Sequence, residues 1–248
     1  MNPEFVRYAP EYGEIPMKAS VREVWLPFNV PLEGRVPWMY LDVRGRVSTA
    51  VGITLDDATH ELGSPTATER ATALAASRRL PWRRGMRGPY ASDTDIDAAW
   101  DTVKRRTDLI RGGWRRFERL TDLRLTNGAI DRLVFERLDE LETLIRGRLA
   151  RHSNGAVIMP FTSFDSWPAD AQLGMLSMCW TTGPSFDFPR FQEAAFTRDW
   201  LRCAAECRVY PEIGTAARRN ERNQELFRNA FRAECDGSDP EQLLFALP

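Results

Sequence analysis

The 248-residue sequence predicts an α+β protein that is mostly helical. Short apolar runs lie on both sides of Gly45, and glycine suits the positive φ of a tight turn, so we expect one β-hairpin there. Apolar residues recur at three- and four-residue steps through residues 129–149, which is typical of an amphipathic helix. Several shorter helical patterns follow that segment. One hairpin among many helices is an α+β arrangement.

The N-terminal half carries clear start and stop signals. We expect a first helix over residues 20–26, stopped by Pro27 because proline lacks the N–H that a helix interior needs. Two strands are expected over residues 38–42 and 46–51, joined at residues 43–45. The next helix is expected over residues 55–62, with Thr54 as N-cap and Gly63 just past the end, and another over 66–80. A helix over 94–110 is expected with Asp93 or Thr94 as cap and with Gly112 and Gly113 at its end, followed by a shorter one over 114–120.

The C-terminal half is expected to be helical. The 129–149 segment is long enough to span about 30 Å at ~1.5 Å per residue. Pro168 suits the first turn of the next helix, Asp165 or Ser166 its cap, and Gly183 its end. The remaining helices are expected over residues 191–196, 198–207 and 216–234, and the apolar residues 243–245 are expected to dock.

Composition and charge indicate a globular protein. Thirty-four lysines and arginines nearly balance 35 acidic residues. The first twenty residues lack a secretory pattern and no stretch is apolar enough for membrane insertion, so we expect synthesis in the cytoplasm without a signal peptide. The four cysteines, Cys179, Cys203, Cys207 and Cys235, are expected to be reduced core thiols. With His60 and His152 they match no zinc spacing, so no metal is expected.

Glu33 and Asp42 are candidate catalytic carboxyls. Cleavage of a glycosidic bond needs a proton for the leaving oxygen and a nucleophile on the other face of the sugar, and two carboxyl groups in unlike surroundings divide these tasks. Glu33 follows an apolar stretch, and Asp42 ends a strand. On the second strand Ser48 has the same side-chain parity as Arg46 and Ala50, so the hairpin register is expected to bring its hydroxyl near Asp42, where the two hold one water molecule. The alternative is structural: a helix-end carboxylate, a turn former and a polar hairpin residue.

The segment EGRVPWMYLDVRGRVSTAVG resembles the active-site block of phage T4-type lysozymes in the order and spacing of its residues. The resemblance implies that Glu33 is the general acid and that Asp42 orients or activates water. Ser48 then stands where the family has threonine. The family's next glycine is Ala50 here, while Gly52 is kept and is expected to let a glycan approach the backbone. Ile53 replaces the histidine that usually follows.

A second segment, ADAQLGMLSMCWTTG, resembles the family's central C-lobe helix. By that match Met178 and Trp180 face the substrate cleft, although a tryptophan on a helix is more often a core residue. The segments FPRFQEAAFTRDWLRCAAEC and ARRNERNQELFRNA resemble the family's closing helices. Residues 56–124 match nothing in the family and are much longer than the corresponding stretch.

The resemblance implies a lysozyme-like two-lobed fold. We expect an N-terminal lobe over residues 1–125 with an insertion over about 56–125, an inter-lobe helix over 126–150 and a helical C-terminal lobe over 151–248. The implied reaction is cofactor-free hydrolysis of the β-1,4 bond between N-acetylmuramic acid and N-acetylglucosamine in peptidoglycan. Such a muramidase acts on the cell wall in the periplasm, as a phage endolysin or an antibacterial effector.

Two alternatives remain open at this stage. One is a lysozyme-fold glycan-binding module that has lost turnover, which the departures at Ala50 and Ile53 motivate. The other is an interaction protein whose arginine-rich residues 78–124 dock a secretion machine, a phage component or a cognate inhibitor. That stretch is either a solvated surface or a contact for an anionic partner: nucleic acid, the peptide carboxylates of peptidoglycan or an acidic protein. The preferred interpretation includes no nucleic acid.

Overall fold

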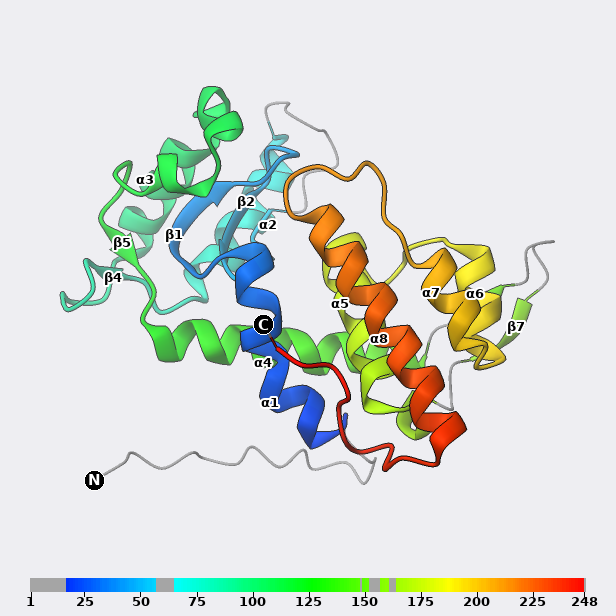
Figure 1. The fold of residues 1–248 in the computed structure, drawn as a ribbon. Coiled ribbons are helices and arrows are strands. Elements are labelled where there is room, and N and C mark those ends of the chain that lie inside the picture. The colour runs from blue at the N-terminus through cyan, green and yellow to red at the C-terminus, as the bar shows by residue number, and fades with distance from the viewer. Residues whose placement is uncertain (1–16, 57–64, 148, 152–156, 161–163, 248) are drawn as a thin grey trace, which may run out of the picture. The chain divides into compact units, whose positions relative to one another are not determined.

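A computed structural model describes residues 17–56, 65–147, 149–151, 157–160 and 164–247 (Figure 1). Helices predominate, and the strands of these residues form three small antiparallel sheets, so the α+β, mostly helical class is confirmed. The chain divides into two compact units, which we call the hairpin unit (residues 26–141 and 211–219) and the helical unit (residues 1–25, 142–210 and 220–248). The helices over residues 19–33, 127–146 and 216–236 each contribute residues to both units.

Helix α1 (Ala19–Glu33) does not stop at Pro27, so the predicted end at residue 26 is wrong. Its buried residues, including Trp25, Phe28 and Leu32, recur at three- and four-residue steps, whereas Pro27 and Pro31 lie on the exposed face. The carbonyl groups that lose their hydrogen bonds to these prolines therefore face solvent, and burial of the opposite face keeps the segment helical.

The hairpin forms as predicted and gains a third strand. Strand β1 (Val36–Leu41) pairs antiparallel with β2 (Val47–Ala50), which pairs with β3 (Ile53–Thr54). The prediction of Thr54 as a helix N-cap is wrong because this residue pairs with Ser48 in the sheet. Residues 57–62 of the helix predicted there, and Gly63, lie outside the described residues.

The stretch from residue 65 to 125 is folded and belongs to the hairpin unit. Helix α2 (Ala67–Arg78) begins with a capping box from Thr66, and α3 (Asp93–Lys104) begins with one from Ser92 rather than from the predicted Asp93 or Thr94. The structure ends α3 six residues earlier than predicted. Two 3₁₀ helices follow, η1 (Thr107–Gly112) and η2 (Trp114–Phe117), and the short strands β4 (Arg83–Arg84) and β5 (Leu123–Arg124) pair with each other.

Helix α4 (Asn127–Arg146) confirms the longest apolar stripe in the sequence. Its residues Ile130, Val134, Leu138, Leu141 and Ile145 are completely buried, at the spacing that one helix face requires. The predicted end of this helix at residue 149 or 150 is wrong, because α4 ends at Arg146 and Leu149 already pairs in a strand. The chain forms β6 (Leu149–Arg151) and β7 (Val157–Pro160), an antiparallel pair that the sequence pattern did not predict.

The helical unit contains α5 (Ala169–Thr182), whose residues 169–179 are all buried. A 3₁₀ turn, η3 (Phe164–Ser166), precedes it. Gly174 of α5 allows close packing, because a Cβ at this position would lie 2.9 Å from Phe227. The helices after α5 are α6 (Pro189–Phe196), α7 (Trp200–Glu206) and α8 (Ala216–Asp236), as predicted to within a few residues (Figure 1).

The C-terminal segment docks in the helical unit, as predicted. The buried carboxylate of Asp170 accepts hydrogen bonds from the backbone N–H groups of Leu244 (2.8 Å) and Phe245 (3.0 Å). Burial raises the pKa of Asp170, while these hydrogen bonds lower it. In the described part of the chain, no helix combines the length and apolar character needed to cross a membrane.

Candidate functional site

Glu33 is the last residue of α1, as its position before glycine predicted. Gly34 has a φ of +81° and donates a backbone hydrogen bond to Val30 (2.8 Å), which is a common way for a helix to end. The Glu33 side chain keeps 25% of its surface exposed and accepts a hydrogen bond from Nη2 of the buried Arg219 at 2.5 Å. The same guanidinium donates to Oδ1 of Asn29 at 2.9 Å. Arg219 therefore fixes the position of the Glu33 carboxylate.

Asp42 closes the hairpin turn. Its Oδ1 accepts from the backbone N–H groups of Arg44 and Arg46, both at 2.9 Å, and its Oδ2 accepts from the Arg46 guanidinium at 2.9 Å. Gly45 occupies the turn with a φ of +76°, as predicted. Nη2 of Arg46 also lies 2.9 Å from Oδ2, so four nitrogens approach a carboxylate that offers about four acceptor positions. Asp42 therefore holds the turn with the same oxygens that the expected chemistry would use.

Tyr40 lies near both carboxylates and was not among the residues selected from the sequence. Burial raises the pKa of its phenol well above the usual value, and the negative charges of Glu33 and Asp42 raise it further. The phenol is therefore neutral at physiological pH.

Ser48 lies opposite Tyr40 in the sheet register, and Tyr40 is two residues before Asp42 on strand β1. The side chain is buried, and its hydroxyl donates to the carbonyl oxygen of Arg46 at 3.5 Å. Ser48 is thus on the same hairpin face as Asp42, as its parity predicted, but no direct hydrogen bond joins the two side chains.

Ala50 adopts a backbone conformation that favours glycine. Its φ is +56° although it is completely buried, and a left-handed conformation costs a residue with a Cβ about 1 kcal/mol. Gly52, two residues later, has a φ of +74° at no such cost. The turn between β2 and β3 therefore has left-handed residues at both positions where the lysozyme motif has glycine.

A buried ion pair supports the turn from the far side of the hairpin unit. Lys104 of α3 donates to Oδ2 of Asp56 at 2.5 Å and to the carbonyl oxygen of Gly45 at 2.8 Å. Asp56 also accepts from the backbone N–H of Val47 at 3.4 Å. The segment that has no counterpart in the lysozyme family thus positions the loop that carries Asp42.

Trp114 of η2 lies against the end of α1 and was also not selected from the sequence. A Cβ on Gly34 would lie 3.0–3.3 Å from the Trp114 indole, so only glycine allows this approach. The carbonyl oxygen of Trp114 accepts from the indole N–H of Trp38 at 3.1 Å, and the two rings pack 5.7 Å apart. The first residue of η2 is therefore a neighbour of the residue that follows Glu33.

Met178 and Trp180 belong to α5 in the helical unit. Met178 is completely buried and offers no surface to a glycan in this conformation. Trp180 is half-buried and packs on Trp25, with 5.1 Å between ring centroids. Trp180 therefore contributes to the core and keeps some exposed surface.

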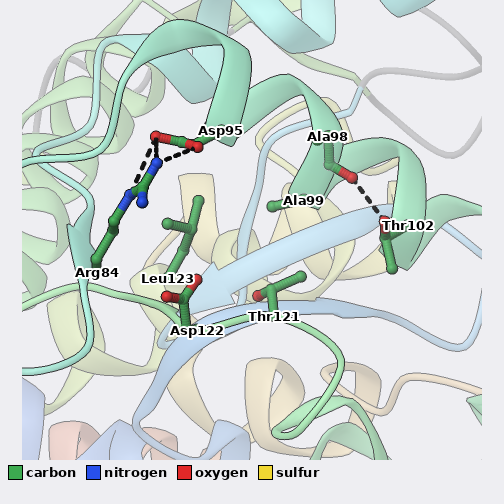
Figure 2. Close-up of a pocket in the computed structure, with 8 residues that line it drawn as sticks. All are labelled: Arg84, Asp95, Ala98, Ala99, Thr102, Thr121, Asp122 and Leu123. Carbon is green, nitrogen blue, oxygen red and sulfur yellow. Dashed lines mark hydrogen bonds and ion pairs between the residues drawn. The ribbon is translucent and has the colours of Figure 1, made fainter.

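A separate pocket of about 290 Å³ lies between α3, β4 and β5 in the hairpin unit (Figure 2). It contains none of the predicted site residues. Arg84 and Asp95, its charged pair, bind each other at 2.6 Å, and Asp95 also caps α3. The Arg84 guanidinium and the hydrogen bonds from Ser92 lower the pKa of Asp95 to about 2. These groups are engaged in maintaining the fold, as are Glu33 and Asp42, so the order of residues in the lysozyme-like segment is what distinguishes Glu33 and Asp42 as candidates.

The described residues contain no group of three or more His, Cys, Asp or Glu side chains that could hold a metal ion. His60 and His152 lie outside the described residues. Within the described residues, all four cysteines are free thiols; Cys179, Cys203 and Cys207 are buried as predicted, whereas Cys235 is exposed.

Comparisons with models of known protein families, with curated proteins and with solved structures find no match to this chain. The assignment of a function therefore depends on the residues themselves.

Proposed function

We propose that this chain is a peptidoglycan hydrolase that cleaves the β-1,4 bond between N-acetylmuramic acid and N-acetylglucosamine. The observation that carries the proposal is that Glu33 ends α1 and Asp42 opens the turn directly after β1, so the two carboxylates flank one strand in the order of the lysozyme motif. Two carboxylates in unlike surroundings are what glycoside hydrolysis requires. The glycine-like backbone at Ala50 also supports the resemblance to T4-type lysozymes.

In the proposed mechanism, Glu33 protonates the leaving oxygen while Asp42, helped by Ser48, positions a water molecule for attack with inversion. Asn29 and Arg219 hold the Glu33 carboxylate in place. Because the Arg46 guanidinium occupies Oδ2 of Asp42, it must move aside before that oxygen accepts a water. In the proposed mechanism, Gly52 lets the glycan strand approach the backbone of the hairpin.

The decisive experiment replaces Glu33 with glutamine. Glu33→Gln should lower the rate of peptidoglycan cleavage by about 1,000-fold or more, because an amide cannot donate an acidic proton. The amide still accepts a hydrogen bond from Arg219 but no longer compensates its buried charge, so we expect a loss of about 3 kcal/mol in unfolding free energy. Activity should be measured well below the unfolding midpoint, and retained activity in the variant would refute the assignment.

The products of the wild-type protein identify the type of reaction. Mass spectrometry of digested peptidoglycan should show hydrated muramic acid ends, which hydrolysis produces. Anhydro ends would instead indicate a lytic transglycosylase, in which no water is consumed.

A second candidate function is glycan binding without turnover. It is favoured by the arginine contacts of both carboxylates, since Arg219 holds Glu33 and Arg46 holds Asp42. Such a protein would co-sediment with purified sacculi and release no reducing ends, and Glu33→Gln would then leave its behaviour unchanged.

The proposed substrate lies in the periplasm, so a protein made in the cytoplasm must be delivered to it during phage lysis or by a secretion machine. A role of residues 78–124 in delivery, or in binding a cognate inhibitor, is part of the proposal. Deleting the stretch would not test it cleanly, because Lys104 supports the turn that carries Asp42. Substitutions at exposed side chains are the better tool.

A further inference from the structure

Four exposed arginines on and beside η2, which we call the η2 arginine face, lack a carboxylate partner. They are Arg111, Arg115, Arg116 and Arg119, and none of them forms an ion pair within the described residues. Several other arginines of the same unit are paired, namely Arg70 with Asp101, Arg78 with Asp97, Arg84 with Asp95 and Arg106 with Asp108. Because no ion pair of the described residues holds the four guanidinium groups, they are available to an anionic ligand.

The η2 arginine face adjoins the candidate site. Trp114 opens η2, and its indole lies against Gly34, the residue that follows Glu33. The hydrogen bond from Trp38 to the carbonyl oxygen of Trp114 fixes this end of η2 to strand β1. Arg115 follows directly, with its guanidinium 4.4 Å from the centre of the Trp114 ring. A polymer bound at Glu33 and extending beyond it in this direction meets the unpaired arginines.

We propose that the η2 arginine face binds the peptide carboxylates of peptidoglycan, an inference that rests on the proposed function. Each N-acetylmuramic acid carries a short peptide with free carboxylates, and a guanidinium group pairs well with a carboxylate through two parallel hydrogen bonds. The face thus selects strands that still carry their peptides, while Glu33 and Asp42 act on the sugar backbone.

A nucleic acid fits this surface less well. The chain has a formal net charge of −1, whereas proteins that bind nucleic acid usually carry a strong positive excess.

The test compares two triple variants with the same change in charge. The face variant carries Arg111→Gln, Arg116→Gln and Arg119→Gln, which leaves Arg115 stacked on Trp114. The control variant carries Arg79→Gln, Arg87→Gln and Arg132→Gln, at exposed arginines of the same unit that also lack an ion pair in the described residues. Both are made in the Glu33→Gln protein, so that binding is measured without cleavage, and both are checked for an unchanged unfolding midpoint.

Binding is measured by co-sedimentation with intact sacculi and with cross-linked sacculi whose peptide carboxylates have been stripped of charge by carbodiimide-mediated amidation, which we call stripped sacculi. At about 0.15 M salt the face variant should bind intact sacculi about tenfold more weakly than its parent, because several partly screened charge contacts are lost. The control variant should bind like the parent. All three proteins should bind the stripped sacculi equally.

The outcomes separate this inference from the proposed function. Equal binding of intact sacculi by the face and control variants would overturn the inference while hydrolysis by the wild-type protein stands. A loss of binding that is as large on stripped sacculi would also overturn it, because the peptide carboxylates would not be the ligand. Loss of binding to a DNA duplex, with sacculus binding unchanged, would assign the face to nucleic acid instead. Absence of both cleavage and binding in the wild-type protein would remove the proposed function itself.

Discussion

The carboxylate of Asp42 accepts hydrogen bonds from two backbone amides of the hairpin turn and from the guanidinium of Arg46. Loss of this side chain would therefore change the turn as well as any chemistry that the carboxylate performs. Asparagine separates the two effects, because it keeps one oxygen for the backbone amides and removes the negative charge.

We predict that Asp42→Asn lowers the cleavage rate by about 100-fold or more while lowering the unfolding free energy by only about 1 kcal/mol. Asp42→Ala should lose the same activity and about 2 kcal/mol, since the turn amides also lose their acceptor. Both quantities can be measured by dye release from labelled peptidoglycan and by urea unfolding.

The control for this comparison is Arg44→Gln. The Arg44 side chain is exposed and only its backbone N–H bonds to Asp42, so stability and rate should both remain close to wild type. Full activity in Asp42→Asn would contradict a role for this carboxylate in positioning water.

Helix α1 shows how packing overrides a local sequence signal. Pro27 and Pro31 lack the N–H groups that would bond to the carbonyl oxygens of Glu23 and Pro27, yet the helix continues to Glu33. Buried side chains on the opposite face supply the compensating free energy, and the helix end places Glu33 beside Arg219.

Replacing these prolines should stabilise the protein. We predict that Pro27→Ala and Pro31→Ala each raise the unfolding free energy by about 1 kcal/mol, because each restores a helix hydrogen bond but gives the unfolded chain more freedom. The midpoint should rise by about 2–4 °C for each substitution, as measured by circular dichroism.

Pro37→Ala is the matched control for the proline substitutions. Pro37 lies in strand β1, so its replacement adds no helix hydrogen bond and should leave the stability unchanged or slightly lower. A fall in midpoint for both helix substitutions would show that the prolines stabilise α1 rather than strain it.

Elements with a strong local signal were predictable from the sequence. The apolar stripe of α4 and the glycine at the centre of the hairpin turn each act over a few residues. The short pairs β4–β5 and β6–β7 were missed, because strands of two to four residues carry too little alternation to be recognised.

At the scale of the whole molecule, contacts between distant segments complete the candidate site. Glu33 and Arg219 are 186 residues apart, and Lys104 reaches the turn at Gly45 across 59 residues. No periodicity or spacing encodes such a pairing in a single sequence. The sequence therefore pointed to Glu33, Asp42 and Ser48 but not to the residues that hold them.

The four thiols should differ in reactivity because the fold buries three of them. Burial raises the pKa of Cys207 from its ordinary value near 9 to about 12 and raises the pKa of Cys203 as well. At pH 8 we predict that Ellman's reagent labels only Cys235 in the native protein and all four cysteines after denaturation. Cys235→Ser should abolish the native reaction, and fast labelling of a second thiol would contradict the described packing.

These thiols also make stability depend on pH in the alkaline range. A thiol whose pKa is higher in the folded protein than in the unfolded chain stabilises the folded state, and this stabilisation is complete at a pH below the pKa of the unfolded chain. The unfolded chain loses its thiol protons first as the pH rises, so stability should fall between about pH 9 and pH 12. Cys207→Ala should weaken this alkaline dependence in denaturant titrations.

The chain has only two lysines, Lys18 and Lys104, and both are buried and held by carboxylates, Lys18 by Glu241 and Lys104 by Asp56. Positive charge on the described outer surface is therefore carried by guanidinium groups. Acetylating enzymes and amine-reactive dyes would find no side-chain amine there to neutralise, and alkaline buffers in the ordinary range would not discharge it. An attraction that arises from this surface is permanent, and salt or a competing anion is the practical means of releasing it.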